Sequence, residues 1–268
     1  MIEGIKENLR RVRCYHSANE LEITLQAARD NEMSYMHFLD ALLHKELEKR
    51  KEQRIMRYKK TANFPLIKTV EEFDFTFQTS ITKRQIKEWQ QLDWLERREN
   101  KIFMGPPGVG KTHLAIALAY TAVLNQYKVK FYTMNELMED MVFAKEDARF
   151  NDFIRKLIKH DLIVIDELGY LPLKPIFANL FFEFVNECYE YRSLIITSNK
   201  LFNEWDAVFG NRTLATAILD RLLHHAEPVV IEGDSYRLKN TRKEFDLNAY
   251  SNMTKKVEKL VEKEEKVY

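Results

Sequence analysis

A glycine-rich loop constrains this chain more than any other feature of its sequence. Its eight residues fit the pattern G-x-x-x-x-G-K-[ST] at every fixed position: Gly105, Pro106, Pro107, Gly108, Val109, Gly110, Lys111 and Thr112. An apolar run at 102–104 precedes this P-loop, and an amphipathic stretch at 112–124 follows it. A strand before the loop and a helix after it form the context in which such a loop wraps the phosphates of a nucleotide. The sequence therefore predicts a site for a nucleoside triphosphate.

The residue types of the P-loop explain this prediction. Glycines let backbone N–H groups close around phosphates, and the following helix adds the positive end of its dipole. Lys111 is expected to neutralise charge on the β- and γ-phosphates, and the hydroxyl of Thr112 is expected to ligate Mg²⁺. A glycine-rich turn without a ligand is the alternative.

A second apolar run, 163–165, ends in Asp166 and Glu167. We expect Asp166 to hold Mg²⁺ through water at the end of a buried strand, and Glu167 to act as general base toward the attacking water. Two acids that only cap a helix are the alternative. A third run, 195–198, ends before Asn199, which can orient that water if its strand lies between the other two. Serine and asparagine after a strand are also ordinary turn residues.

Short apolar runs alternate with helix-length amphipathic stretches in the second part of the chain. The runs lie at 101–104, 129–133, 162–166, 194–198 and 228–231, and the stretches at 112–124, 133–143, 176–189 and 214–225. This alternation predicts an α/β fold with right-handed crossovers and a parallel sheet flanked by helices on both faces. One run lies between the lysine and aspartate motifs. That order favours the ATPases with an additional strand over the GTPases and kinases.

Four segments are expected along the chain. They are a small all-α N-terminal domain at 1–62, a linker and leading helix at 63–100, a nucleotide-binding core at 101–243 and a charged tail at 244–268. The leading helix begins with a capping sequence at 82–85 and is expected to run through Trp89 and Trp94. The tryptophans and Tyr170 are interpreted as packing residues.

The last predicted helix of the N-terminal segment changes character along its length. Apolar residues at Met36, Leu39, Leu43 and Leu47 recur at helical spacing and are expected to anchor its start. Between positions 45 and 60, eight basic and three acidic residues give a net charge of +5. This basic part is either a solvated helix face or a surface that contacts the phosphate backbone of DNA.

The composition excludes several classes of protein. The net charge is +1, so any site for a polyanion has to be a local patch. Two cysteines are too few for a disulfide scaffold or a cysteine-rich zinc site, and the histidines His160, His224 and His225 show no metal-ligand spacing. Residues 1–13 are charged and lack an apolar stretch, so we expect no secretory signal, and no apolar run approaches the ~20 residues that span a bilayer. We expect a soluble cytoplasmic protein without a membrane partner.

Beyond these motifs, the sequence resembles a known family. The P-loop with His113 and Leu114 directly after it is similar to the AAA+ clade of the DnaA initiators and the DnaC-type helicase loaders. Several segments resemble the IstB family, the helper ATPases of one group of bacterial insertion sequences: 72–75, 92–94, 161–173, 198–199, 204–205, 208–210, 217–225 and 236–239. The resemblance is most specific in the nucleotide-binding core.

The resemblance implies an AAA+ ATPase that uses ATP and Mg²⁺, binds and remodels duplex DNA, and delivers it to the transposase of its element. It also implies homo-oligomers with ATP sites between protomers, and it adds His113 to the nucleotide-binding residues. The matching position for an arginine finger is Arg221, with Arg212 as a nearby alternative; a guanidinium supplied in trans stabilises charge in the transition state. Phe73 and Phe75 are candidates for the adenine pocket, or else core residues.

Three other functions stay open at this point. A DnaC-type helicase loader shares the ATPase core but would prefer single strands and bind a helicase. A nucleotide-gated binding module would assemble with ATP and scarcely hydrolyse it, which Glu167 argues against. A metabolic kinase would transfer phosphate to a small molecule and does not need a carboxylate at position 167.

Overall fold

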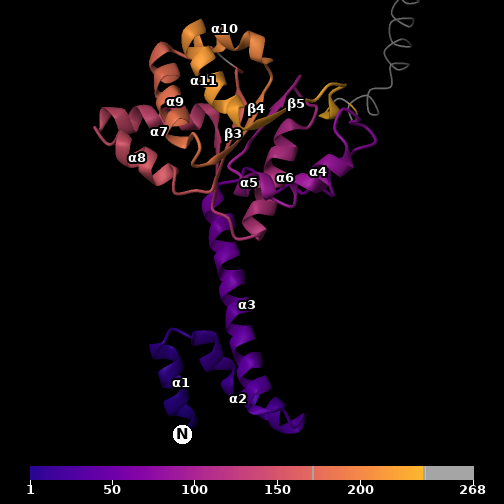
Figure 1. Ribbon diagram of the computed structural model, residues 1–268, viewed down its shortest axis with the longest axis vertical. Coiled ribbons are helices and arrows are strands. Elements are labelled where there is room, and N and C mark those ends of the chain that lie inside the picture. The colour runs from indigo at the N-terminus through magenta and orange to yellow at the C-terminus, as the bar shows by residue number, and fades with distance from the viewer. Residues whose placement is uncertain (171, 238, 240–268) are drawn as a thin grey trace, which may run out of the picture.

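The computed structural model describes residues 1–170, 172–237 and 239. Over these residues, a helical N-terminal region is joined by one long helix to an α/β core (Figure 1). The expected tail at 244–268 and the end of the expected core at 240–243 lie outside the described residues.

The core is built on a five-stranded sheet in the order β2-β3-β4-β1-β5. Its strands are β1 (Asn100–Met104), β2 (Val129–Thr133), β3 (Leu162–Leu168), β4 (Ser193–Ser198) and β5 (Ala226–Val230). All neighbouring strands pair in parallel, which confirms the predicted fold class. Because β4 lies between β1 and β3, the residues that follow these three strands meet at one edge of the sheet.

Helices cover both faces of this sheet (Figure 1). One face carries α7 (Met134–Glu146), α8 (Phe150–Leu157), α9 (Pro175–Cys188), the short 3-10 helix η1 (Phe202–Glu204), α10 (Trp205–Phe209) and α11 (Arg212–His224). The other face carries α4 (Lys83–Trp89), α5 (Asp93–Glu96) and α6 (Lys111–Leu124). A parallel sheet buried on both faces needs an apolar core on each side, and the structure has two such cores. In the described part of the chain, no helix combines the length and the apolar character needed to cross a membrane.

One predicted helix is divided in the structure. The leading helix ends at Trp89, and α5 begins only at Asp93. Leu92, between them, has a φ of 68°, which lies outside the conformations of a right-handed helix. All three tryptophans are buried, as expected of packing residues.

The N-terminal region consists of α1 (Ile2–Arg11), α2 (Tyr15–Asp30) and α3 (Tyr35–Ala62). The prediction that an apolar stripe anchors the start of α3 is wrong, because its four residues are 44–74% exposed: Met36, Leu39, Leu43 and Leu47. The buried positions are Leu42 and Glu46, one residue earlier, on the side of α3 that α2 covers. The carboxylate of Glu46 accepts the backbone N–H of Ser17 at 2.7 Å and Nε of Arg50 at 2.7 Å.

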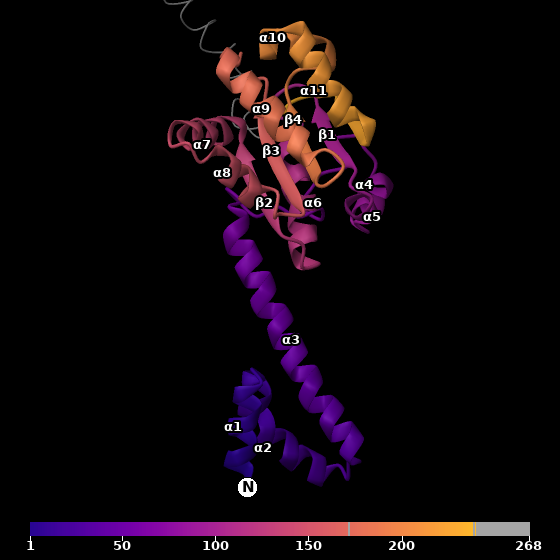
Figure 2. The same ribbon diagram turned by 60° about the vertical axis from the view of Figure 1, so that its left-hand side comes forward.

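The second half of α3 leaves this hairpin and ends on the core (Figure 2). Nη1 of Arg54 donates to Oε1 of Gln126 at 3.1 Å, and the ammonium of Lys59 lies 5.4 Å from the centroid of the Tyr120 ring. Ala62, at the end of the helix, is completely buried. A single helix of 28 residues therefore joins the two parts of the molecule.

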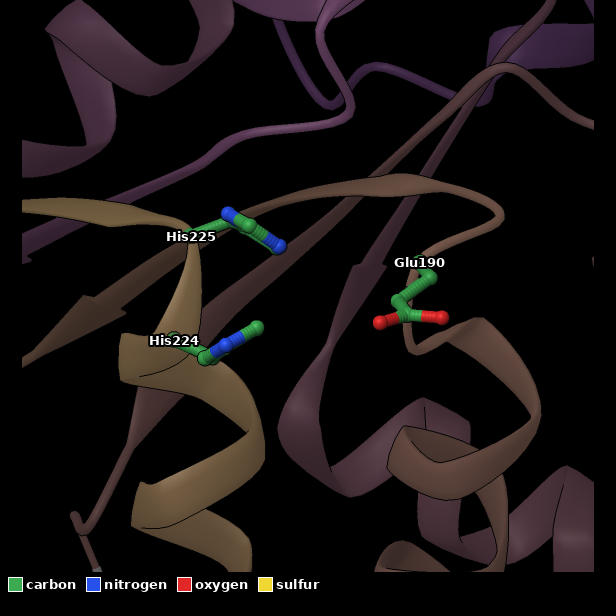
Figure 3. Close-up of side chains that lie close together, drawn as sticks. All are labelled: Glu190, His224 and His225. Atoms are coloured by element: carbon green, nitrogen blue, oxygen red, sulfur yellow. The ribbon is translucent and has the colours of Figure 1, made fainter.

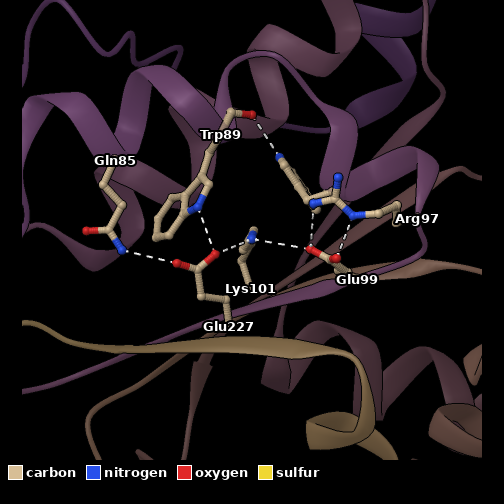
Figure 4. Close-up of polar contacts among 7 residues, drawn as sticks. Gln85, Trp89, Arg97, Glu99, Lys101 and Glu227 are labelled. Carbon is tan, nitrogen blue, oxygen red and sulfur yellow. Dashed lines mark hydrogen bonds and ion pairs between the residues drawn. The ribbon is translucent and has the colours of Figure 1, made fainter.

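A buried lysine ties the leading segment to the sheet (Figure 4). Lys101 in β1 is 1% exposed, and its ammonium lies 4.8 Å and 5.5 Å from the ring centroids of Trp89 and Trp94. Its Nζ donates to Oε2 of Glu227 at 2.6 Å. Glu227 also accepts hydrogen bonds from Gln85 and from the indole of Trp89, so one carboxylate holds α4, β1 and β5 together.

The two partners of this ion pair should contribute unequally to stability. Glu227→Ala leaves the ammonium of Lys101 buried without its closest carboxylate, and we expect the free energy of unfolding to fall by about 2–3 kcal/mol. Lys101→Met keeps an apolar stem between the indoles and leaves a carboxylate that is 43% exposed and can be hydrated. We therefore expect a loss of about 1 kcal/mol or less for that variant.

Urea unfolding of both variants beside the unmodified protein measures this difference. Equal losses, or a larger loss for Lys101→Met, would show that the buried ammonium does not depend on Glu227.

Candidate functional site

A cavity of about 520 Å³ opens at the carboxyl ends of the strands. The P-loop, between β1 and α6, lines one part of it, and residues at the ends of β3 and β4 line another. Two further segments contribute: residues 65–78, which follow α3, and residues 236–237, which follow β5. This edge of an open α/β sheet is where ligands bind in proteins of this architecture.

The P-loop adopts a backbone that its glycines allow. Gly105 and Gly110 have φ values of 141° and 102°, which other residues rarely adopt. A Cβ at Gly105 would lie 2.0 Å from the carbonyl oxygen of Ile231, and one at Gly110 would lie 2.6 Å from Cε2 of Phe73. Neighbouring segments therefore pack directly onto the loop, and a larger residue at either position would displace them.

Lys111 is buried inside the P-loop. Its Nζ donates to the backbone carbonyls of Gly105 and Pro106, at 2.7 Å each. Burial lowers the pKa of this ammonium below its usual value, and the positive charge of Arg237 acts in the same direction, whereas Asp166 opposes both. The ammonium thus lies inside the P-loop, where the phosphates of a bound nucleotide would replace the two carbonyls as its hydrogen-bond acceptors.

Two threonine side chains from different elements meet at one buried carboxylate. Asp166, at 4% exposure, accepts hydrogen bonds from Oγ1 of Thr112 at 2.8 Å and from Oγ1 of Thr197. Thr112 and Asp166 thus lie together as the two motifs predict, whereas Thr197 was missed. Its position two residues before Asn199 in the same strand end was the available signal, because alternate residues of a strand share a face.

A bulge directs Glu167 away from the strand pairing. The register between β3 and β4 shifts between Ile165 and Leu168, and Glu167 has a φ of 65°. Its backbone N–H donates to Oγ1 of Thr197 at 3.0 Å. Bulges of this kind re-aim side chains next to functional sites, and the exposed side chain of Glu167 lines the cavity.

Asn199 follows β4 and also lines the cavity. Its Oδ1 is buried and has no hydrogen-bond partner among the residues that the structure describes. A buried polar atom without a partner is destabilising unless a ligand or water satisfies it. Because β4 lies between β1 and β3, Asn199 stands between the P-loop and Glu167, which is the condition under which it can orient a water.

Aromatic rings also line the cavity. Phe73, Phe77 and Tyr236 line it, and the rings of Phe77 and Tyr236 are 5.2 Å apart. Phe75 is not among the residues that line this cavity; its ring packs on Phe73, with centroids 4.8 Å apart. Of the two phenylalanines suggested by the sequence, Phe73 therefore reaches the cavity, while Phe77 and Tyr236 were missed.

Two further residues differ from simple expectation. His113 lines the cavity, but its Nε2 lies 2.8 Å from the carbonyl oxygen of Thr69, and its ring packs edge-on against Phe73 at 5.4 Å. Tyr170 is not a packing residue: it is 68% exposed and lines the cavity beside Glu167. The turn at 169–170, directly after β3, carries its ring outward.

The segment after β5 contacts both the P-loop and the linker that follows α3. The backbone N–H of Tyr236 donates to the carbonyl of Gly108 at 2.9 Å. Nζ of Lys239 donates to Oδ2 of Asp74 at 2.8 Å and lies 4.8 Å from the ring centroid of Phe77. The hydrogen bond from Lys239 holds the pKa of Asp74 well below its usual range. Arg237, also missed by the sequence, lines the cavity from this segment.

Arg221 is not among the residues that line the cavity. It lies in the last turn of α11, close to where β1 and β5 begin, whereas the cavity opens where the strands end. Its Nε donates to Oδ1 of Asn186 at 3.0 Å, and its guanidinium lies 4.7 Å from the ring centroid of Phe182.

The core is similar in fold to replication initiators. AMPPCP-bound DnaA from Aquifex aeolicus matches 66% of this chain and 55% of its own length, with a TM-score of 0.50 and 24% sequence identity. A crystal structure of a DNA replication initiation factor matches the same shares, with a TM-score of 0.52 and 26% identity. The chain thus spans about half the length of these proteins, and the likeness shows a P-loop AAA+ core.

Relatives in sequence cover nearly the whole chain. The ATP-binding protein of insertion sequence IS21 from Pseudomonas aeruginosa is 43% identical over 235 residues, which are 88% of this chain and 89% of the relative. The ATP-binding protein of insertion sequence IS5376 from Geobacillus stearothermophilus is 38% identical over 242 residues, or 90% and 96%. The model of the IstB-like ATP binding protein family matches residues 8–244. With its P-loop core and these relatives, the chain belongs to the IstB-like family of insertion-sequence ATP-binding proteins.

Proposed function

We propose that this chain is the ATP-hydrolysing helper of an insertion sequence, which assembles on duplex DNA and delivers it to the transposase of its element. The observation that carries the proposal is the arrangement at the ends of three adjacent strands. There, the P-loop lysine, the two threonines that donate to Asp166 and the outward-turned Glu167 line one cavity. The names of the relatives, ATP-binding proteins of insertion sequences, support the biological setting.

ATP is the proposed ligand of the cavity. The phosphates would lie at the polar end, against the P-loop backbone and Lys111. The rings of Phe73, Phe77 and Tyr236 offer an apolar, stacking surface for the purine base at the other end.

The polar end also fits Mg²⁺, a cation that prefers oxygen ligands. Thr112 and Asp166 would hold it, since their oxygen atoms lie 2.8 Å apart beside Lys111 and Glu167, which follow the same strand ends. The buried, unpartnered Oδ1 of Asn199 is a further oxygen at this end. When bound there, Mg²⁺ would neutralise charge on the β- and γ-phosphates.

Glu167 is the proposed general base. Its carboxylate would accept a proton from a water whose oxygen attacks the γ-phosphorus, while the bond to the β–γ bridging oxygen breaks and ADP leaves. Asn199 would orient this water. The hydrogen bond from the Glu167 backbone to Thr197 supports the role by fixing the turn that carries the carboxylate.

Arg221 is proposed to act on the ATP of a neighbouring protomer. It lies far along the sheet from the cavity of its own chain, and its contacts with Asn186 and Phe182 fix its guanidinium at the surface of α9. A fixed cation at this place could reach phosphate only across an interface, which would couple hydrolysis to assembly.

The region 1–62 is proposed as the domain that binds DNA or the transposase. In the basic part of α3, between positions 45 and 60, every basic residue except the half-buried Lys45 is exposed. A dense run of exposed cations on one rod-like helix suits the phosphate backbone of duplex DNA.

The proposed position of the purine base can be tested by truncating two phenylalanines in separate variants. Phe77→Ala removes a ring that lines the cavity, and we expect the Kd for ATP to rise about tenfold, because stacking on a base is worth about 1–3 kcal/mol. Phe75→Ala removes a ring of the same size that only packs on Phe73, and it should change the Kd less than about twofold. Fluorescent-nucleotide titration distinguishes them, and equal effects would refute this position for the base.

The role of Glu167 can be tested by a neutral replacement. Glu167→Gln should lower ATP turnover by at least about 100-fold with little change in nucleotide affinity, because only the proton acceptor is lost. Glu139→Gln, on the exposed side of α7, is the matched control and should leave turnover unchanged. If Glu167→Gln hydrolyses ATP as fast as the unmodified protein, the assignment of the base is wrong.

Assembly provides the test of the whole proposal. With a slowly hydrolysed ATP analogue, the particle mass should grow to a large oligomer on duplex DNA, and Lys111→Ala and Arg221→Ala should each prevent this growth. Arg212→Ala tests the other candidate for the arginine finger: Arg212 is exposed at the other end of α11, 3.8 Å from Asp206, and we expect its loss to leave assembly unchanged. A protein that stays monomeric on duplex but binds single strands or a helicase would be a loader of the DnaC type instead.

A further inference from the structure

A second group of chemically active side chains lies at the amino ends of the strands, away from the nucleotide cavity. Glu190, His224 and His225 bring their ligand atoms within 4.8 Å of one another, and all three residues are exposed (Figure 3). The sequence shows no metal-ligand spacing here, because the histidines are adjacent and the third residue lies in the turn after α9. Only the fold brings the two segments together.

The backbone around this group is fixed from several sides. The N–H of Asn100 donates to the carbonyl of His225 at 2.7 Å, and its side-chain amide donates to the carbonyl of Leu222 at 2.9 Å. Oδ1 of Asn100 accepts the N–H of Leu194, which belongs to the strand that follows the Glu190 turn. One asparagine therefore connects the end of α11, where His224 and His225 follow one another, to the beginning of β4.

The side chains are also oriented for ligation. The ring centroids of His224 and His225 lie 4.1 Å apart, and Nδ1 of His224 lies 3.0 Å from the hydroxyl of Tyr189. An outer hydrogen bond of this kind fixes the orientation of a metal-ligating imidazole. Figure 3 shows the carboxylate of Glu190 facing the two rings, and within the described residues this carboxylate has no hydrogen-bond or ion-pair partner.

We propose that Glu190, His224 and His225 form a binding site for a divalent transition-metal ion of the Zn²⁺ type. Two imidazoles and one carboxylate are a ligand set that suits Zn²⁺ and excludes Mg²⁺, which prefers oxygen alone. A tetrahedral Zn²⁺ site needs ligand atoms about 3.4 Å apart. The three ligand atoms must therefore move closer together by about an ångström, which the exposed side chains can do by changing their torsion angles. The fourth position would be open to water.

Bound metal would join the turn after α9 to the end of α11. The nearby arginines do not occupy the carboxylate: Nη1 of Arg98 and Nη1 of Arg192 both donate to the carbonyl of Tyr191, at 2.8 Å and 2.7 Å. The proposal is independent of ATP hydrolysis and of DNA binding, because none of the three ligands lines the nucleotide cavity.

The test is a titration of the untagged full-length protein with Zn²⁺, in competition with a chromophoric chelator and with millimolar Mg²⁺ present throughout. We expect one equivalent to bind, and Co²⁺ in its place to give the visible absorption of a tetrahedral complex. His224→Gln, His225→Gln and Glu190→Gln should each weaken binding by at least about tenfold. His44→Gln is the matched control, because His44 is an exposed histidine 3.4 Å from Glu48 and should not affect binding.

Thermal unfolding gives a second readout. A hundredfold excess of Zn²⁺ over its Kd should raise the unfolding midpoint by about 5–10 °C in the unmodified protein and not in the His224→Gln/His225→Gln variant. The proposal would be overturned if this double variant bound Zn²⁺ as tightly as the unmodified protein. It would also be overturned if His44→Gln weakened Zn²⁺ binding as much as the variants of the three ligands do. The absence of any Zn²⁺ binding by the unmodified protein would overturn it as well.

Discussion

The buried carboxylate of Asp166 is the interaction on which the nucleotide cavity depends. An ionised group removed from water must be satisfied by hydrogen bonds, and two threonines from different elements provide them. Thr197 donates to this carboxylate and accepts the backbone N–H of Glu167 with the same hydroxyl. The position of an exposed glutamate is thus connected, bond by bond, to the first turn of the P-loop helix.

The two ends of the sheet are built on different principles. At the carboxyl ends, glycines, a bulge and an unpartnered amide leave space and polar atoms for a ligand. At the amino ends, the structure is closed: Glu227 fastens Lys101 and the leading helix to the edge strand, and Asn100 joins the neighbouring segments. Strained backbone and unsatisfied polar groups are tolerated only where the surrounding structure holds them in place. The tightly bonded amino ends of the sheet therefore allow such groups to persist at its carboxyl ends.

Features that depend on local sequence could be predicted well. The P-loop, the alternating strands and helices and the meeting of Thr112 with Asp166 follow from short motifs and from the geometry of parallel sheets. Phe77, Tyr236 and Arg237 could not be found in this way, because segments distant in sequence bring them to the cavity. The prediction that the apolar stripe anchors α3 is wrong for another reason. Helical periodicity gives the spacing of apolar residues but not which side of the helix its partner covers. Here α2 covers Leu42 rather than Leu43.

The long helix α3 has a geometric consequence for the molecule. Its 28 residues span about 42 Å, and only its first half is supported by α2, while its end is held against the core. A tilt of about 10° where the helix meets the core therefore displaces its far end by about 7 Å, which is about two base-pair steps along a DNA duplex. Any rotation of the core at this junction would thus be amplified at the N-terminal end of α3.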